Sequence, residues 1–495
     1  MNYLKFRRQF VLSVSAINVE NNWRTITLKK TDNPFNLYVH PDLDLYEVEN
    51  ENYQLILLGY ILDPFAPEKS NEDILQNIAG ENDFLSVIKA THTLNGRFVI
   101  IYNDRTSVKL FNDATGFREI YYIHSNGMIA CGSTPNVLSR HLSIPIHQVK
   151  EISDFYNSPE FNQKDHVWIG EDTVYQDVKK LLPNHYLDLT GKKTIRFWPS
   201  EERKIIKLND AAKHMSKILV GTFDAACKRY ELYQGLTSGW DTRLFLSACK
   251  KHVDEIHFYF FRGYKYDSVG KVGMDYKVAK HIAETNNFPL EIIEIQDSKI
   301  DKNFEEIYYQ NNVLARPKLL PIYYDAFKKK LDNTKTVSGS MGNEILRLMS
   351  TIDRKIDNGY KIAQNLNYQK YPYIIGSINN WLNETLSLRD MNYVLIDLFH
   401  WEQYIGNWGA LSSSEQDIVR DEIRPYNNRE LLSTYISLKD KNRYKDYPMG
   451  HVKTIEILWK DLLGFKMHLE KYHSKKFLRF FGLEQLADKI YQRFK

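Results

Sequence analysis

The sequence predicts an α/β protein in which a β-sandwich is followed by a parallel sheet with a helical C-terminal part. Three observations predict this class. Residues 1–200 contain short apolar runs between turn signals, whereas helical patterns alternate with apolar strands from about residue 205. From about residue 350, long segments rich in Trp and Tyr show no strand alternation. The predicted domains are therefore residues 1–200 and residues 205–495.

In the first domain, apolar runs of strand length occur at residues 54–60, 97–102 and 107–111. Turn signals separate them, at Asn95-Gly96, Asn103-Asp104 and Thr115-Gly116. The runs and turns predict hairpins in a sandwich. The start, residues 5–16, has basic residues before an apolar stretch, and its polar and apolar alternation favours a first β-strand over a weak signal peptide.

The second domain alternates two kinds of segment. Helical patterns at residues 210–230 and 275–286 alternate with apolar strands at 255–261 and 290–295. Such alternation predicts βαβ units around a parallel sheet. We place the boundary between the two domains after residues 197–199 and before Lys207.

Composition excludes several classes of protein. With 495 residues, 43% of them hydrophobic and 26% charged, the chain is an ordinary globular protein of two or three domains. A net charge of +4 is too small to indicate nucleic acid or an anionic membrane as the partner. No apolar run approaches the ~18 residues that span a bilayer. The three cysteines, Cys131, Cys227 and Cys249, show no metal-ligand spacing and predict core thiols of a reduced, cytoplasmic protein.

The segment at residues 232–243 carries the strongest chemical signal. An apolar strand end meets small hydroxyl and Gly residues, and a helix is expected at 244–251. Backbone N–H groups at a helix N-terminus bind anions, and a Gly lets the backbone approach closely. Asp241 beside phosphates indicates a bridging Mg²⁺. The alternative is a loop in which Asp241 only caps the helix. The candidate pyrophosphate-binding residues are Leu236, Thr237, Ser238, Gly239, Asp241 and Thr242.

Anchored on Asp241, this stretch resembles the pyrophosphate loop Ser-Gly-Gly-x-Asp-Ser of the asparagine synthetase family. Thr237 stands for the first Ser, and Ser238 replaces the first Gly. Gly239 is the second Gly, while Asp241 and Thr242 take the Asp-Ser positions. The hydroxyls, one Gly and the carboxylate are therefore kept.

A second loop, residues 336–344, resembles the family's Ser-Gly-Glu-Gly-x-Asp-Glu. Ser338, Gly339 and Glu344 agree with it. Ser340 replaces an acidic residue, and Asn343 replaces an Asp that the family uses near the metal and pyrophosphate. Asn keeps a metal-binding oxygen but loses a charge, which predicts weaker Mg²⁺ binding or a shifted role for Glu344.

The resemblance covers most of the chain. The strand at 256–261 corresponds to one whose backbone contacts adenine in the family, so Phe258 and Tyr259 become candidate adenine neighbours, with simple core packing as the alternative. Residues 422–428 look like a shortened Glu-x-Arg-x-Pro-Phe-Leu-Asp. Segments resembling the core strands of the family's glutaminase domain lie at 94–100, 112–122, 130–134, 182–186 and 196–198.

The first domain departs from the family at its nucleophile. The family's glutaminase uses a cysteine that becomes residue 1 after Met removal, with its α-amine as base. This chain begins Met1-Asn2-Tyr3, which resembles members without glutaminase activity. Among these, β-lactam synthetase uses an amine already present on its substrate. The resemblance thus implies an inactive Ntn-hydrolase-like sandwich followed by a PP-loop ATP pyrophosphatase domain of the adenine nucleotide alpha hydrolase type.

The implied function is an ATP-dependent amide-bond-forming ligase, asparagine synthetase B-like or β-lactam synthetase-like, that adenylates a small-molecule or peptide carboxylate and transfers ammonia or a substrate amine. Surface-polysaccharide and natural-product biosynthesis are both open, and so is a homodimer. The implied catalytic residues are Glu344 and either Lys453 or Lys445. Phe258, Ser338 and Gly339 join the nucleotide site, with Asp241 and Asn343 on the metal.

Two alternatives remain open at this point. The altered residues Ser238, Ser340 and Asn343 also suit a non-catalytic nucleotide-binding or scaffold member of the family. A macrolactam cyclase of the lasso-peptide type differs from the ligase only in its substrate.

Overall fold

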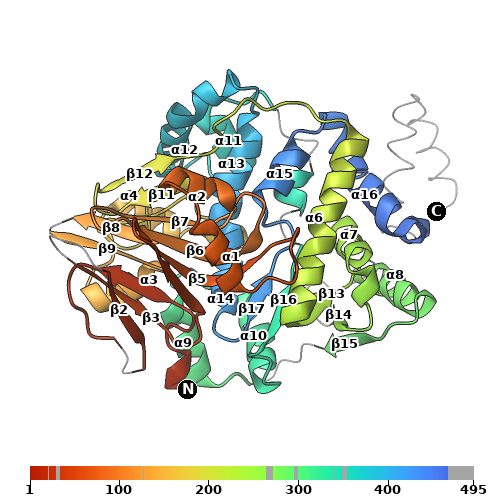
Figure 1. Cartoon of the computed structure of the whole chain (residues 1–495), viewed down its shortest axis with the longest axis horizontal. Helices are drawn as coiled ribbons and strands as arrows, with labels where there is room; N and C mark the ends of the chain where they lie inside the picture. The colour runs from red at the N-terminus through yellow and green to blue at the C-terminus, as the bar shows by residue number, and fades with distance from the viewer. Residues whose placement is uncertain are drawn as a thin grey trace.

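The structure is a computed structural model that describes residues 1–19, 22–28, 34–125, 127–262, 271–294, 299–339, 342–347 and 354–465, without the side chains of 271, 272, 274, 342 and 343. The predicted α/β class is confirmed. Antiparallel sheets form the first part of the chain, and a five-stranded parallel sheet with helices follows (Figure 1). None of the helices in the described ranges is long and apolar enough to cross a membrane.

The first part is a sandwich of two six-stranded sheets. One sheet has the order β10 (Val178–Lys180), β8 (Tyr121–Ser125), β9 (Met128–Gly132), β1 (Phe10–Ser13), β3 (Phe35–Val39), β2 (Arg24–Leu28). The other has the order β12 (Lys193–Arg196), β11 (His185–Asp188), β7 (Val108–Asn112), β6 (Asn95–Asn103), β5 (Gln54–Leu62), β4 (Leu45–Glu49).

Strand β5 explains why the apolar runs of this part are nearly continuous. Ile56 and Leu58 point into the core between the two sheets. Leu55 and Leu57 point the opposite way, into a second core formed with α1 (Asn71–Ile78) and α2 (Phe84–Ala90). Successive strand residues face opposite sides, so a strand covered on both faces has no solvent-facing positions.

The predicted strands at 54–60, 97–102 and 107–111 lie in β5, β6 and β7, and the start of the chain contains β1. The turn predicted at Asn95-Gly96 is wrong, because both residues belong to β6, with Gly96 opposite Ile61. At Gly96 a Cβ would lie 2.4 Å from the Tyr60 carbonyl oxygen. The glycine therefore permits close strand approach and does not mark a turn.

The parallel sheet has the order β15 (Leu290–Glu294), β14 (Ile256–Arg262), β13 (Glu231–Gly235), β16 (Thr334–Val337), β17 (Asp421–Ile423). The chain leaves β13 toward β14 on one side and later returns to β16 on the other, so the order reverses between β13 and β16. Helix α6 (Leu208–Arg229) leads into β13. The helices between β13 and β16 are α7 (Trp240–Ala248), α8 (Lys271–Thr285), α9 (Lys302–Asn311) and α10 (Leu320–Lys328). Helix α7 begins four residues before the helix predicted at 244–251.

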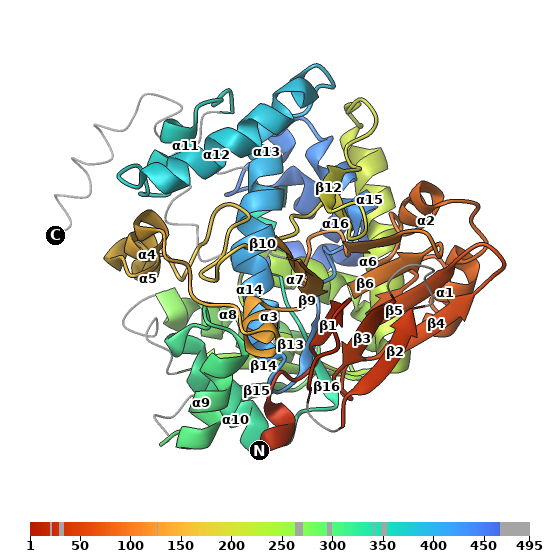
Figure 2. The same ribbon diagram turned by 90° about the vertical axis from the view of Figure 1, so that its left-hand side faces the viewer.

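The remaining helices belong to the first part and to the C-terminal part of the chain. The first part contributes α3 (Pro135–Leu142), α4 (Lys150–Tyr156) and α5 (Pro159–Gln163). The C-terminal part contributes α11 (Gly359–Asn365), α12 (Pro372–Thr385), α13 (Leu395–Phe399), α14 (Ala410–Gln416), α15 (Arg429–Ile436) and α16 (Met449–Trp459). A π-helical segment, His400–Gly409, joins α13 to α14 into one long rod (Figure 2). The sequence predicts only helices here and misses β17, which has three residues and no room for alternation.

One hydrophobic core spans the predicted domain boundary. This core includes Phe117 and Trp168 of the first part together with Phe223, Phe245 and Trp401 of the second. The two predicted domains therefore pack tightly against each other.

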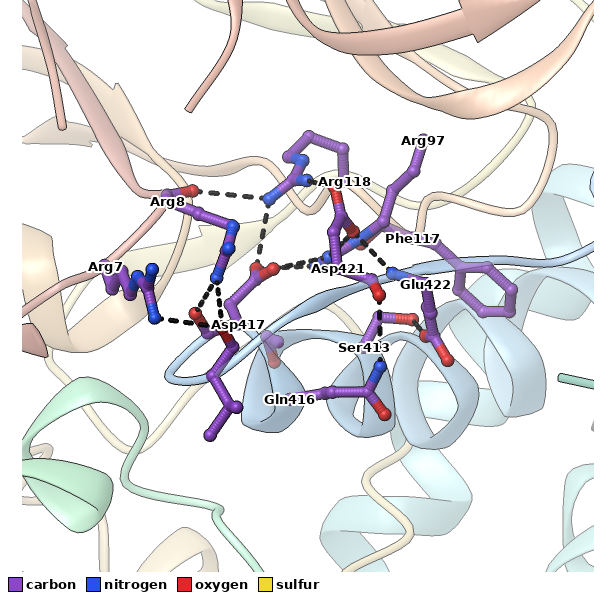
Figure 3. A network of polar contacts seen from close by, with 12 residues as sticks. Arg7, Arg8, Arg97, Phe117, Arg118, Ser413, Gln416, Asp417, Asp421 and Glu422 are labelled. Carbon is purple, nitrogen blue, oxygen red and sulfur yellow. Dashed lines mark hydrogen bonds and ion pairs between the residues drawn. The ribbon is translucent and has the colours of Figure 1, made fainter. Parts of the chain in front are cut away.

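A buried ionic network joins the same two parts (Figure 3). Arg97 contacts Asp417 at 2.6 Å and Asp421 at 2.7 Å. Arg118 contacts the same two carboxylates at 3.0 and 3.1 Å. Lys335 of β16 adds a third cation, 3.2 Å from Asp421. We call these five residues the interface network. Burial favours the protonated form of Asp421, but Lys335, Arg118 and Arg97 outweigh it and hold the pKa of Asp421 well below its usual value.

Candidate functional site

A cleft of about 600 Å³ lies over the carboxyl ends of the parallel strands. It opens where the strand order reverses, which is where open parallel sheets bind their ligands. Its walls include the ends of three strands and the turns that follow them, at Gly235, Leu236, Thr237, Tyr259, Phe260, Phe261, Val337, Ser338 and Gly339. We call this space the strand-end cleft.

The turn from β13 to α7 forms one wall of the strand-end cleft. The backbone N–H of Leu236 donates to the Tyr259 carbonyl oxygen at 2.9 Å, which fixes the strand end. The hydroxyls of Thr237 and Thr242 lie 3.0 Å apart, and the Gly239 N–H donates to Thr237 Oγ1 at 3.1 Å. Helix α7 thus begins beside the cleft with its positive dipole end and an ordered turn, both of which favour an anion.

The structure separates the predicted nucleotide residues into two groups. Those that line the strand-end cleft are Leu236, Thr237, Thr242, Ser338 and Gly339. Ser238 is buried and donates its hydroxyl to the Asp275 carboxylate. Phe258 packs against Phe288 in the core, with ring centroids 4.6 Å apart, and it is the neighbouring Tyr259 that lines the cleft. Gly239 is the N-cap of α7.

Two guanidinium groups of the strand-end cleft lack partners at one nitrogen. The Nη1 atoms of Arg420 and Arg424 are buried and have no hydrogen-bond partner among the described residues. Arg424 is paired with Glu422 at 2.7 Å. The Arg420 guanidinium lies over the Tyr233 ring, 5.5 Å from its centroid, and forms no ion pair with the residues that the structure describes. Because burial disfavours the charged form, the pKa of Arg420 is lowered. A buried cation that forms no ion pair within the described part of the chain is consistent with an anionic ligand.

Asp241 lies on the first turn of α7, with its side chain 14% exposed. Its Oδ2 accepts from Arg347 Nη2 at 2.5 Å. Its Oδ1 accepts from Tyr426 Oη at 3.0 Å and lies 3.2 Å from His451 Nε2. Burial would raise the pKa of Asp241, but Arg347 and the hydrogen bonds from His451 and Tyr426 outweigh burial and lower it. Asp241 is therefore an ionised, fully partnered carboxylate.

Glu344 lies in a π-helical turn, Gly342–Leu346. Burial and the neighbouring charge of Asp241 raise the pKa of Glu344 to about 8. Its Oε2 is buried and has no hydrogen-bond partner within the part of the chain that the structure describes. Asn343 lies in the same turn, but its side chain is outside the described residues.

Glu344 lines a second cavity, of about 300 Å³. We call it the Glu344 cavity. The other residues of its wall are Lys164, Val167, Ile362, Asn365, Leu366, Tyr368, Ile396, Phe399, His400, Tyr404 and Lys445. Of the two candidate lysines, Lys445 is thus brought together with Glu344. Lys453 lies on α16 and pairs with Glu456 at 2.7 Å, and it lines neither space.

Sequence reasoning missed the groups that hold Asp241. Tyr426 falls in the segment 422–428, and Arg347 follows Glu344 by three residues. Neither position in the sequence indicates that its side chain contacts Asp241. His451 comes from α16, 210 residues along the chain from Asp241. Arg420 carried no signal either, because its importance comes from burial without a counter-ion.

The three thiols are all shielded. Cys131 and Cys249 are buried, which confirms the prediction for them, whereas Cys227 is half-buried. Burial raises the pKa of Cys131 and of Cys249, and it raises the pKa of Cys227 to about 12. A thiol acts as a nucleophile through its thiolate, so none of the three is activated.

Comparison with known proteins gives weak likenesses. No family model and no curated protein matches the chain. A glutamine phosphoribosylpyrophosphate amidotransferase from B. subtilis, solved with ADP and GMP, has a TM-score of 0.24 and 11% identity, over 61% of this chain and 64% of that one. An NH3-dependent NAD synthetase from Campylobacter jejuni subsp. jejuni NCTC 11168, solved with nitrate, has a TM-score of 0.21 and 14% identity, over 39% and 92%. An allosteric regulatory enzyme of purine biosynthesis has a TM-score of 0.25 and 10% identity, over 74% and 73%.

This chain therefore spans less than two thirds of the first of these proteins.

Proposed function

We propose that this protein is an ATP-dependent ligase that forms an amide bond, as its resemblance to the asparagine synthetase family implies. In the proposed reaction, a carboxylate oxygen of the substrate attacks the α-phosphorus of ATP, and pyrophosphate leaves with the electrons of the broken P–O bond. Ammonia or a substrate amine then attacks the acyl carbon, and AMP leaves. The protein contributes mainly positioning and charge neutralisation.

The observation that carries this proposal is the Arg420 guanidinium in the strand-end cleft, whose buried Nη1 has no hydrogen-bond partner among the described residues. It lies in the same space as Thr237 and Thr242, beside the start of α7. A triphosphate offers the anionic oxygens that all these groups require. Gly339 contributes by its size, because a Cβ there would lie 3.0 Å from the Cβ of Asp241 and would press the two loops apart.

The carboxylates near the cleft suit Mg²⁺ in their chemistry. Magnesium prefers oxygen ligands, and Glu344 Oε2 is a buried oxygen without a partner in the described residues. Asp241, Glu344 and the predicted Asn343 are the residues that would hold the ion. When bound, the ion would neutralise charge on the pyrophosphate. Asp241 would share its carboxylate with Arg347, which already balances its charge.

Lys445 is the stronger candidate for the catalytic lysine, because it shares the Glu344 cavity with Glu344. A cation at this position can hold the substrate carboxylate and stabilise negative charge that develops at the reacting carbonyl. For Lys453 to act as the catalytic lysine, its ion pair with Glu456 would have to break.

Replacing Arg420 by Met is expected to weaken ATP binding about 10-fold to 100-fold, because a charge-assisted hydrogen bond contributes about 1.5 to 3 kcal/mol. Isothermal titration calorimetry with ATP measures this. Arg262→Met is the matched control, since Arg262 is 55% exposed and lies outside the cleft, and it should bind ATP like the wild type. Failure of the wild type to bind ATP would contradict the proposed function.

The purified protein is expected to release no glutamate from glutamine above background, with or without ATP. The physical reason is that all three thiols are buried or half-buried and have raised pKa values. Amide synthesis should instead depend on added ammonia or on an amine in the substrate. The measurement is glutamate release, with mass spectrometry of all cysteines after exposure to a glutamine-like electrophile. ATP-stimulated glutamate release by a preparation free of contaminating glutaminase would overturn the expectation.

A second candidate function is nucleotide binding without catalysis. It is favoured by one observation: the Asp241 carboxylate already contacts Arg347, Tyr426 and His451 and is therefore occupied by protein partners. The two functions differ in ATP–pyrophosphate exchange with a panel of carboxylic acids. Exchange with any acid supports the ligase, whereas ATP binding without exchange across the panel supports the scaffold.

A further inference from the structure

We propose that the Glu344 cavity binds a small carboxylic acid with a bulky, largely apolar body, and holds its carboxylate at Lys445. This inference rests on the proposed function and names its substrate class. It selects among the small-molecule and peptide carboxylates that the sequence leaves open.

The side chains that line the cavity indicate which kind of substrate body it accepts. Three aromatic and four aliphatic side chains form most of the lining: Tyr368, Phe399, Tyr404, Val167, Ile362, Leu366 and Ile396. Its volume of about 300 Å³ is at the lower end of ligand pockets, which run from about 300 to 1,000 Å³. The space therefore suits one small, apolar molecule and excludes a folded peptide from its interior.

The charged side chains of the cavity indicate which charged end of a substrate it accepts. Lys445 is half-buried in the lining, and the exposed Lys164 lies at the rim. His400 adds no charge at neutral pH, since burial lowers the pKa of His400 to about 4. Glu344 and Asn365 supply oxygen and nitrogen atoms for hydrogen bonds. Lys445 and Lys164 can each donate charge-assisted hydrogen bonds to the carboxylate of an anion with a single charged end.

The cavity adjoins the strand-end cleft at three places. Lys164 lines the cavity and the next residue, Asp165, lines the cleft. Tyr404 lines the cavity and Trp408 the cleft, and their ring centroids are 5.4 Å apart.

The third place is the second predicted loop, where Gly339 lines the cleft and Glu344 the cavity. Lys445 lies near enough to Glu344 for its charge to lower the pKa of that carboxyl, against the larger effect of burial. A carboxylate held by Lys445 would therefore lie near Glu344, on the side of the cavity that borders the proposed nucleotide site.

A sugar acid is disfavoured by the same walls. Each buried hydroxyl of a uronic acid needs a hydrogen-bond partner, and a hydroxyl facing Ile362, Leu366 or Phe399 would find none in them. An aspartate-sized acid would leave much of the apolar wall uncovered.

The test is direct binding without nucleotide, by isothermal titration calorimetry with 4-phenylbutyrate, 4-methylpentanoate, glucuronate and aspartate. We expect the two apolar acids to bind at least 10-fold more tightly than glucuronate or aspartate. The neutral amide 4-phenylbutyramide should bind at least 10-fold more weakly than its acid. Tighter binding of glucuronate or aspartate, or no binding of any acid, would overturn the inference.

Variants locate the binding. Leu366→Trp fills the half-buried rim and should weaken binding of 4-phenylbutyrate at least 10-fold while ATP binding stays unchanged. Lys445→Met should remove the preference for the acid over its amide. Lys361→Met is the control, because Lys361 is exposed on the same helix as Ile362 and lies outside the cavity. An unchanged affinity in both cavity variants would also overturn the inference.

The two proposals fail separately in this design. Loss of acid binding with ATP binding intact contradicts only the substrate class. Acid binding without any ATP binding contradicts the ligase and leaves the cavity assignment standing.

Discussion

Asp421→Asn is expected to lower the free energy of unfolding by about 3 to 5 kcal/mol, which is the cost of leaving buried charges without their partner. In the interface network, Asp421 faces Arg97, Arg118 and Lys335, whose side chains are 3%, 1% and 9% exposed. Asn keeps the shape but removes the charge. Arg97 and Arg118 would then be left with Asp417, and Lys335 would lose its ion pair with Asp421. Urea unfolding followed by circular dichroism measures the change.

The matched control is Glu284→Gln, at an exposed pair in which Lys280 and Glu284 lie 3.5 Å apart. Such surface pairs contribute about 0 to 1 kcal/mol. Asp421 also predicts a pH effect. Since its folded pKa is below the ordinary 3.8, its contribution is present above that pH and is lost on acidification. The variant should therefore show a shallower loss of stability toward low pH, and a stability equal to that of the control would contradict the role of the network.

Asp241→Asn is expected to lower ATP–pyrophosphate exchange by about 100-fold or more, the scale seen when one charge-stabilising group is removed from a reaction centre. Asn keeps the volume and one acceptor oxygen for Tyr426 or His451. It loses the charge that balances Arg347 and that would face the metal. The measurement is exchange with the tightest-binding acid, beside the unfolding midpoint of the same variant.

Asp241→Ala should in addition lose stability, because it leaves Arg347, 7% exposed, without a carboxylate. From the sequence, Asp241 stands in a loop, and its removal is expected to leave the fold intact. The structure places Asp241 in the first turn of α7 with three partners, which favours a loss of stability instead. Asp254→Asn, on the exposed turn before β14, serves as the control. Wild-type exchange in Asp241→Asn would eliminate the carboxylate from the proposed chemistry.

Local patterns were sufficient for much of the fold and for part of the candidate site. The apolar runs that became β5, β6 and β7, and the turn after β13, depend on residues close in sequence. The contacts of Asp241 with Arg347, Tyr426 and His451 could not be predicted, because they join segments 106, 185 and 210 residues away. Phe258 shows the same limit: strand alternation placed it correctly in a strand but could not say which face meets the cleft.

The position of β17 gives the antiparallel sandwich a structural role. β17 is the last strand of the parallel sheet, and its Glu422 carbonyl oxygen accepts from Tyr60 of β5 at 2.5 Å. Just beyond it, Asn95 donates to the carbonyl oxygens of Arg424 and Pro425. An uncovered sheet edge presents unpaired backbone groups to other chains and invites aggregation. The antiparallel sandwich thus works as a fixed cap that keeps this edge from pairing with a neighbouring molecule.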